Sequence, residues 1–168
     1  MSTGFVYLRP LALVCVRTHG AYATSSLAAW RQMFAWLDDS GMRRKIGCGY
    51  GLMRDNPALT APEQCRYDAC VELLAGFENT VPAGFRDARL PGGAYARQRQ
   101  LGTQGLDAAI TSLRDAWVPS HGLAVDRDRP FIEIYLDDPA TTPVEKRRVN
   151  LCIPVGMGAT LGGHTRAA

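Results

Sequence analysis

An internal repeat is the feature of this sequence that most restricts its fold. Turn residues recur at a separation of 82 positions, as in Gly20 and Gly102 or Asp55 and Asp137. The same separation joins Pro57 to Pro139, Arg66 to Arg148, and Cys70 to Cys152. A separation of 81 joins Trp36 to Trp117 and Gly41 to Gly122, consistent with one residue deleted near a helix end. The repeat indicates that two copies of one structural unit make up the chain.

Each copy has the pattern strand, helix, strand, strand. Runs rich in apolar and β-branched residues predict strands at 6–17, 46–53 and 66–74 in the first copy, and at 88–99, 131–136 and 148–155 in the second. Apolar residues at helical spacing predict one helix in each copy: Leu27, Trp30, Phe34 and Leu37 at about 25–39, then Leu106, Ile110, Leu113 and Trp117. We expect the first stripe, and Leu106, Ile110 and Leu113 of the second, to be buried against the sheet.

Two βαββ copies predict an α+β fold. We expect one antiparallel sheet with both helices on one face. The other face should be open and carry a ligand cleft between two halves related by a pseudo-two-fold axis. The domain should span residues 1–156, with halves at about 5–80 and 86–156. The Gly-rich segment 157–168 is expected to be a flexible tail.

Charge and hydropathy exclude several classes of protein. The net charge is +3, and the 19 basic residues are interleaved with 16 acids, so the sequence lacks the basic stripe of a nucleic-acid-binding domain. An apolar content of 46% is typical of a globular chain rather than a disordered one. The sequence has no apolar stretch long enough to span a membrane, and we expect no N-terminal signal peptide.

The cysteines and histidines give no pattern of metal ligands. The five cysteines stand at 15, 48, 65, 70 and 152, without a CxxC pair, and three of them lie in apolar strand-like runs. We therefore expect buried, reduced thiols and a cytoplasmic protein. The three histidines fall in turns or near the end of the chain, so we predict no metal and no cofactor.

Several segments, taken in order, resemble the GyrI-like family. They are Tyr50-Gly51, Arg54-Asp55-Asn56-Pro57, residues 60–71, Leu90-Pro91-Gly92-Gly93-Ala94-Tyr95-Ala96, Trp117-Val118-Pro119-Ser120 and Pro130-Phe131-Ile132-Glu133-Ile134-Tyr135-Leu136. The resemblance covers about residues 5–156. It implies a duplicated βαββ module that binds bulky, lipophilic and often cationic small molecules between its halves. No helix-turn-helix segment stands before residue 5, so we expect a stand-alone effector-binding module rather than a complete transcription factor.

Glu133 is the strongest candidate for a site residue. Strand alternation places it on one face with Phe131 and Tyr135, and we assign the opposite face, with Ile132, Ile134 and Leu136, to the helices. A carboxylate between two aromatic rings suits a flat cation, and burial would also raise its pKa and suit it to general-base chemistry. Periodicity alone leaves open a solvent-facing glutamate. The resemblance places the pocket glutamate of the family at this position.

Other candidates follow from the repeat and from the resemblance. The counterparts of Glu133 and Tyr135 in the first copy are Gly51, which would leave space for a ligand, and Met53, which adapts to varied shapes. Tyr67 resembles a pocket tyrosine of the family, and core packing is its alternative role. Trp36 and Trp117 lie at equivalent helix ends and are candidates for the cleft or the core.

These residues support two function classes. The first is a protein that binds or senses a lipophilic, cationic or aromatic compound. The second is a hydrolase for cyclopropane-type DNA-alkylating compounds, with Glu133 as general base and Tyr135 or Tyr67 stabilising the developing oxyanion. The resemblance adds a third hypothesis, an inhibitory interaction with DNA gyrase. We predict a small-molecule ligand and no direct partner among nucleic acids or membranes.

Overall fold

The computed structural model describes residues 2–75, 77, 81–102, 105–138 and 141–158. The first copy of the repeat comprises β1 (Thr3–Leu8), β2 (Leu11–His19), α1 (Tyr22–Asp39), β3 (Gly49–Met53) and β4 (Arg66–Glu72). The second comprises β5 (Phe85–Leu90), β6 (Gly93–Leu101), α2 (Leu106–Ser112), a π-helical turn η3 (Leu113–Trp117), α3 (Val118–Ser120), β7 (Leu123–Val125), β8 (Phe131–Tyr135) and β9 (Arg148–Met157). The first residue of the expected tail, Met157, belongs to β9, and residues 159–168 lie outside the described residues.

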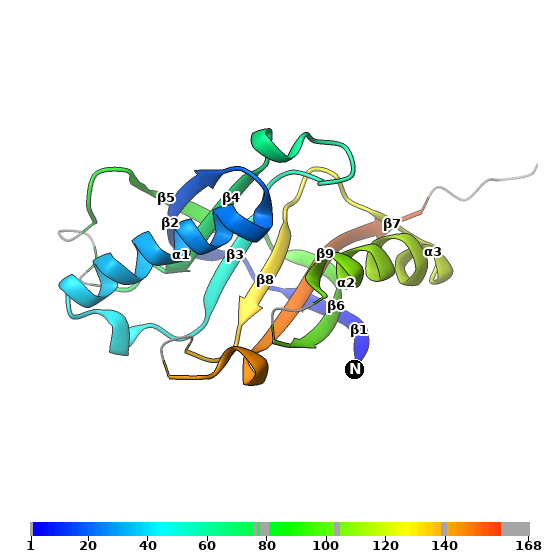
Figure 1. Cartoon of the computed structure of the whole chain (residues 1–168). Helices are drawn as coiled ribbons and strands as arrows, with labels where there is room; N and C mark the ends of the chain where they lie inside the picture. The colour runs from blue at the N-terminus through cyan, green and yellow to red at the C-terminus, as the bar shows by residue number, and fades with distance from the viewer. Residues whose placement is uncertain (1, 76, 78–80, 103–104, 139–140, 159–168) are drawn as a thin grey trace, which may run out of the picture.

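The strands form one antiparallel sheet, in the order β1-β6-β9-β8-β3-β4-β2-β5, with β7 paired to β9. Both α1 and the run from α2 to α3 lie on one face of this sheet (Figure 1). The two copies meet where β3 pairs with β8. The expected α+β architecture is therefore confirmed.

A pseudo-two-fold axis follows from the register of this central pair. Gly51 of β3 lies opposite Glu133 of β8, and the two residues are also counterparts in the repeat. A residue that pairs with its own counterpart lies beside the axis that relates the copies. Glu133 is therefore positioned near the centre of the sheet, between the two halves.

The outermost strands are exchanged between the copies. The sequence suggested single strands at 6–17 and 88–99, but each is divided into two, β1 with β2 and β5 with β6. β1 pairs with β6 of the second copy, and β5 pairs with β2 of the first. Each copy is therefore a ββαββ unit that gives its first strand to the other copy.

The exchange requires two bends that contact one another. Arg9 and Pro10 separate β1 from β2, and Pro91 and Gly92 separate β5 from β6. Proline fixes its own backbone and has no N–H for a strand ladder, so it is suited to such an interruption. A Cβ at Gly92 would lie only 2.6 Å from Pro10 Cδ, so only glycine allows this approach.

Both faces of the sheet are buried, which corrects the expectation of one open face. On the helix side, Ala29, Met33 and Leu37 of α1 belong to the main core. On the other side, a second core is enclosed by the bent strands and contains Leu13, Cys15, Leu52, Cys70, Leu90, Tyr95, Ile132 and Cys152. The prediction that Ile132, Ile134 and Leu136 pack under the helices is wrong, because Ile132 and Ile134 belong to this second core. Alternation correctly separated the two faces of β8, but it does not reveal which face the helices cover.

The apolar stripe of α1 is also rotated from its expected position. Leu27 is 65% exposed, and Trp30 and Phe34 are only partly buried, whereas Ala29 and Met33 are fully buried. In the second copy, Ile110 and Leu113 are buried as expected. The exposed side of the α1 stripe is available for another role.

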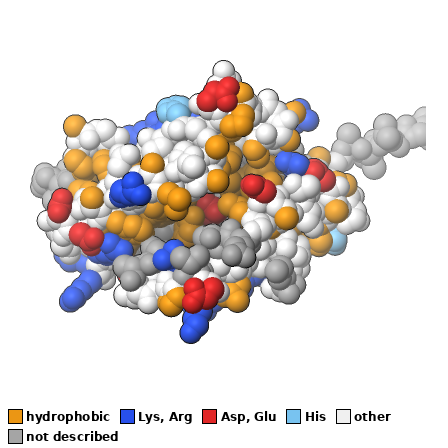
Figure 2. Space-filling model, viewed as in Figure 1, with side chains coloured by type: hydrophobic (Ala, Val, Ile, Leu, Met, Phe, Trp, Pro, Cys, Tyr) orange, Lys and Arg blue, Asp and Glu red, His pale blue; other side chains and the backbone are white. Residues whose placement is uncertain are grey.

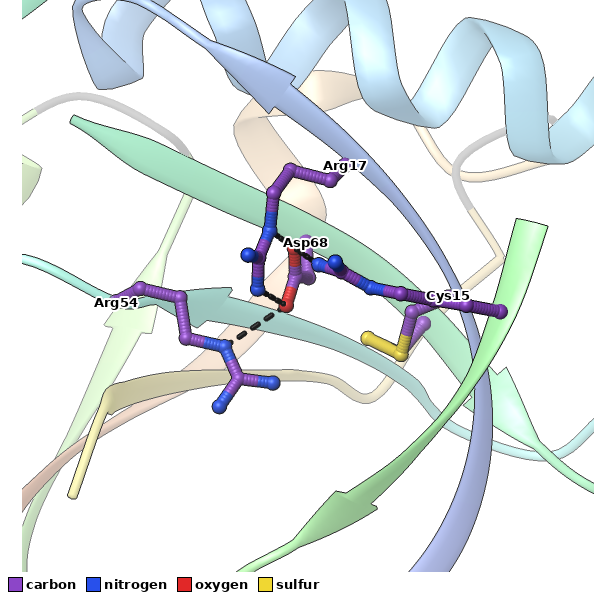
Figure 3. The surroundings of a disulfide bond; sticks show 6 residues. Cys15, Arg17, Arg54 and Asp68 are labelled. Atoms are coloured by element: carbon purple, nitrogen blue, oxygen red, sulfur yellow. Dashed lines mark hydrogen bonds and ion pairs between the residues drawn. A yellow bond between two sulfur atoms is a disulfide. The ribbon is translucent and has the colours of Figure 1, made fainter. Parts of the chain in front are cut away.

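Two cysteines are not the reduced thiols expected from the sequence. Cys15 of β2 and Cys70 of β4 lie directly opposite one another and form a disulfide (Figure 3). Their spacing of 55 residues hides this contact, because only the pairing of the strands brings them together. Cys65 and Cys152 are free and buried, and Cys48 is free and partly buried.

Beside the disulfide, Asp68 is fully buried and receives hydrogen bonds from Arg17, Arg54 and Arg86 at 2.6–2.9 Å (Figure 3). Burial alone would raise the pKa of Asp68, but the hydrogen bonds from Arg17 and Arg54 outweigh it and lower the pKa. The corresponding position of the second copy is Asn150, which accepts a hydrogen bond from Arg99.

Within the described ranges, no helix has both the length and the apolar character needed to cross a membrane. The His, Cys, Asp and Glu side chains of the same ranges form no group of three or more that is placed to hold a metal ion.

Candidate functional site

The main cavity lies on the helix side of the sheet, between α1 and the start of α2, and has a volume of about 760 Å³. Figure 2 shows the hollow with hydrophobic side chains along its border. Its lining includes Tyr22, Ala23, Ser26, Leu27, Trp30, Arg31, Phe34, Arg43, Ile46, Gly47, Gly49, Gln100, Gly102, Gly105, Leu106, Asp107, Glu133, Tyr135, Asp137, Asp138, Arg147 and Val149. A volume of this size accommodates a small organic molecule rather than an ion.

Glu133 of β8 is an acidic group on the floor of this cavity, and only 5% of its surface is exposed. Its Oε2 accepts hydrogen bonds from Tyr67 Oη at 2.9 Å and from Tyr135 Oη at 3.1 Å. The two phenol oxygens are 3.3 Å apart. The carboxylate is therefore held by two neutral donors, and no ion pair with Glu133 is found among the described residues.

Trp30 of α1 completes this hydrogen-bonded group. Its Nε1 donates to Tyr67 Oη at 3.0 Å, so the hydroxyl proton of Tyr67 is directed to Glu133. The Trp30 ring meets Tyr135 edge to face, with centroids 5.1 Å apart, and stacks on Phe34 at 5.3 Å. One wall of the cavity is thus an aromatic surface next to the carboxylate.

Gly51 makes room for this arrangement. A Cβ at this position would collide with Tyr67 Oη and would lie 2.8 Å from Glu133 Oε2. Any larger residue on β3 would therefore separate the tyrosine from the carboxylate. The absence of a side chain at Gly51 therefore allows the hydrogen bond between Tyr67 and Glu133.

Burial dominates the ionisation of the group. It raises the pKa of Glu133, although the hydrogen bonds from Tyr67 and Tyr135 act in the opposite direction. Burial, reinforced by the neighbouring carboxylate, also raises the pKa of both tyrosines well above the ordinary value of a phenol. The tyrosines therefore remain proton donors across the physiological range.

The rim of the cavity carries charges of both signs. Arg43 lies over the Phe34 ring at 4.2 Å and makes ion pairs with Asp38 and Asp138. Arg31 and Asp107 also line the cavity, from α1 and α2. Since these groups are solvated or paired, the rim contributes less to selectivity for charge than the buried floor does.

The structure brings together four of the residues expected from the sequence. Glu133 and Tyr135 line the cavity, and Tyr67 and Gly51 lie directly beside them. Phe131 lies on the same face of β8, which is the face under the helices rather than an open one.

The remaining candidates lie elsewhere. Met53 pairs with Phe131, and both are buried in the main core and border a smaller cavity of about 290 Å³. Trp36 packs in the core against Phe77 and Phe85. Trp117 contacts Phe5 of β1 and stacks on His121. Neither tryptophan lines the main cavity.

Sequence reasoning missed the contribution of α1 to the site. The helical spacing of Trp30, Phe34 and Leu27 predicts a core stripe, but these residues line the cavity. A signal was present, since the apolar surface of this helix also includes Ala29 and Met33 and is wider than one packing stripe requires. No sequence pattern marks Gln100, which is a buried polar side chain in the lining.

The comparisons with solved structures agree with this architecture. A hydrolase from Listeria innocua matches with a TM-score of 0.63 at 13% identity, covering 92% of this chain and 91% of that one. The EcmrR C-terminal domain matches with a TM-score of 0.68 at 10% identity, covering 93% and 98%. SAV2435, bound to tetraphenylphosphonium, matches with a TM-score of 0.59 at 13% identity, covering 93% and 94%. At these identities the likeness shows a shared fold.

Among curated proteins, no sequence matches this chain. The model of one protein family does match, and it spans residues 1–156, which include every strand and helix described above apart from the last residue of β9. The chain belongs to the family of GyrI-like small-molecule-binding domains.

Proposed function

We propose that this protein binds bulky, lipophilic cations or aromatic compounds in the main cavity, as a drug- or toxin-binding or sensing module. The observation that carries the proposal is the buried carboxylate of Glu133, which lies on an aromatic-walled floor without a cationic partner among the described residues. Burying an anion is costly unless a positive charge compensates it. A cationic ligand would supply that charge.

The walls suit the apolar part of such a ligand. Trp30, Phe34, Tyr22 and Tyr135 present rings, and Leu27, Ile46 and Leu106 add aliphatic surface. Aromatic faces attract cations as well as apolar groups. SAV2435, which shares the fold, is bound to the lipophilic cation tetraphenylphosphonium, and this supports the same class of ligand for the present chain.

A hydrolase is the second candidate, favoured by the two phenol donors at 2.9 and 3.1 Å from Glu133. In such a reaction Glu133 would take a proton from water while the water oxygen attacks a ring carbon of an electrophilic cyclopropane. The breaking C–C bond would pass its electron pair to a conjugated carbonyl oxygen, which a tyrosine hydroxyl would stabilise and which would finally receive the proton. A hydrolase from Listeria innocua also shares the fold.

One substitution tests both candidates. Glu133→Gln keeps the shape of the side chain but removes its charge, so tetraphenylphosphonium should bind more weakly by about 1–3 kcal/mol, while the neutral triphenylmethanol should be little affected. Isothermal titration calorimetry measures both affinities. Glu72→Gln, the same change at the end of β4, is the matched control and should leave both unchanged.

The hydrolase predicts a different result from the same variant. Glu133→Gln should then leave the binding of a cyclopropane substrate nearly intact and abolish its turnover, since a general base acts mainly in the transition state. Product formation followed by chromatography distinguishes the two cases. If tetraphenylphosphonium fails to bind the native protein and no turnover occurs, both candidate functions are refuted.

A further inference from the structure

Gln100 is a second polar group of the cavity floor, and the function proposed above does not use it. It comes from β6 and is 6% exposed. Its Nε2 has no hydrogen-bond partner within the described part of the chain. A buried donor without an acceptor is rare in native proteins and calls for a specific explanation.

The sheet register fixes the position of Gln100 relative to the carboxylate. Gln100 lies opposite Val149 of β9, and Val149 lies opposite Tyr135 of β8. All three side chains line the cavity. Since neighbouring strands are about 4.8 Å apart, the Cα atoms of Gln100 and Tyr135 are about 10 Å apart across the floor. The carboxylate group and the amide therefore mark two separate polar points in an otherwise largely apolar cavity.

This spacing matters because few other buried groups on the floor are polar. Val149 separates the two points, and Trp30 and Phe34 form the wall beside Glu133. A terminal amide turns easily about its last torsion, so Gln100 can direct Nε2 to an acceptor placed beside it. A ligand that fills the cavity with apolar surface alone would leave this donor unsatisfied.

We propose that Gln100 selects ligands that carry a hydrogen-bond acceptor, such as a ketone, ester or ether oxygen, at a distance from their cationic centre. The inference rests on the proposed binding of lipophilic cations at Glu133 and narrows the ligand class to amphipathic cations with a remote acceptor. Glu133 recognises the charge, and Gln100 recognises the acceptor.

The test uses two phosphonium ions of nearly equal shape. (4-Acetylphenyl)triphenylphosphonium carries a ketone oxygen, and (4-isopropenylphenyl)triphenylphosphonium has a methylene group in its place. The native protein should bind the ketone on the order of tenfold more tightly, the effect of one satisfied buried donor. In Gln100→Met, which keeps an unbranched side chain of similar length, the two ligands should bind equally.

Two further variants control for indirect effects. Gln98→Met makes the same change two residues earlier on the same face of β6, at a side chain that does not line the cavity, and should retain the preference for the ketone. Glu133→Gln should weaken both ligands by the same factor. Thermal melts show whether each variant is folded, and Gln100→Leu replaces Gln100→Met if the latter is not.

The outcomes separate this inference from the function on which it rests. If both ligands bind the native protein with equal affinity, or if Gln100→Met keeps the preference, the role of Gln100 is refuted while the proposed function stands. If neither ligand binds the native protein, the proposed function fails and the inference fails with it.

Discussion

At the scale of single residues, the site depends on one difference between two equivalent positions. Glu133 and its counterpart Gly51 face each other beside the pseudo-two-fold axis. Two glutamates there would place two carboxylates side by side in a buried environment, where like charges raise each other's pKa. With glycine in one copy, a single carboxylate lies at the centre and Tyr67 reaches it across the vacant Cβ position.

The raised pKa of Glu133 predicts how cation binding depends on pH. Only the ionised carboxylate attracts a cation, so the affinity for tetraphenylphosphonium should be constant at high pH and decrease as the pH falls through the raised pKa. Below that pKa the loss should approach tenfold per pH unit until the affinity of the protonated state is reached. Calorimetric titrations between pH 4.5 and 8 measure this dependence.

Folding stability should change in the opposite sense. Because the folded-state pKa of Glu133 is above its unfolded value, the native state binds the additional proton, and the contribution of this group to stability increases as the pH falls through the folded pKa. A loss of affinity at low pH therefore cannot be assigned to unfolding caused by Glu133. In Glu133→Gln the affinity for tetraphenylphosphonium should no longer depend on pH. An unchanged slope of affinity against pH in that variant would show that another group titrates.

The sequence predicted the residues next to Glu133 on the sheet, but not the helix side chains that cover them. The offset of the repeat selected Gly51, and the family resemblance selected Tyr67 and Glu133, because both operate on residue identity. Neither reports the direction in which a helix presents its side chains. Helical spacing therefore predicts a core position for Trp30, although its indole N–H is hydrogen-bonded at the site.

At the scale of elements, alternation and helical periodicity predicted the position of most strands and of both helices. They did not predict that the strands expected at 6–17 and 88–99 are each divided into two, because pairing between distant strands leaves no local pattern. The division at Pro10 could have been anticipated, since a proline within a strand run indicates an interruption. β1 and β5 also occupy equivalent positions in the two copies, so the separation of the repeat indicates that both strands exist.

The disulfide between β2 and β4 leads to a prediction about stability. Cys15 and Cys70 close a loop over a separation of 55 residues, and removing such a link typically costs about 2–4 kcal/mol. The double variant Cys15→Ala/Cys70→Ala should lose about this amount in urea unfolding. Its stability should also no longer respond to a reductant.

Cys152→Ala is the control for this experiment. Cys152 is a free, buried thiol of the same core as the disulfide, so its removal reproduces the loss of a buried sulfur but not the loss of the link. This variant should retain the response to reductant. Equal stability of the native protein with and without reductant after complete unfolding and refolding would contradict a contribution from the disulfide.

At the scale of the whole molecule, the cavity has a floor and walls of different character. The floor belongs to the continuous sheet, in which β6, β9, β8 and β3 are neighbours. The walls belong to α1 and the start of α2. These helices pack on the sheet through side chains and are not part of its hydrogen-bonded ladder. Adaptation to a ligand is therefore expected in the helices rather than in the sheet.

Hydrogen exchange tests this division. Saturating tetraphenylphosphonium should slow exchange of backbone amides in α1 and α2, while the amides in the ladder between β3 and β8 should exchange slowly and at the same rate with and without ligand. Mass spectrometry of peptides from each element gives these rates. A large gain in protection within the β3–β8 ladder would indicate instead that the two copies separate in the free protein.

The exchange of β1 and β5 has a consequence for the thermodynamics of binding. Each copy is tied to the other by six ladder pairs on either side of the bends, in addition to the central pair of strands. The two copies therefore cannot move apart by a hinge motion without breaking the pairing of β1 with β6 and of β5 with β2. A ligand therefore meets a sheet whose backbone was already ordered during folding, and the conformational entropy lost on binding is confined to the helical walls. The side chains on the floor, which the sheet holds in place, then contribute most to selectivity.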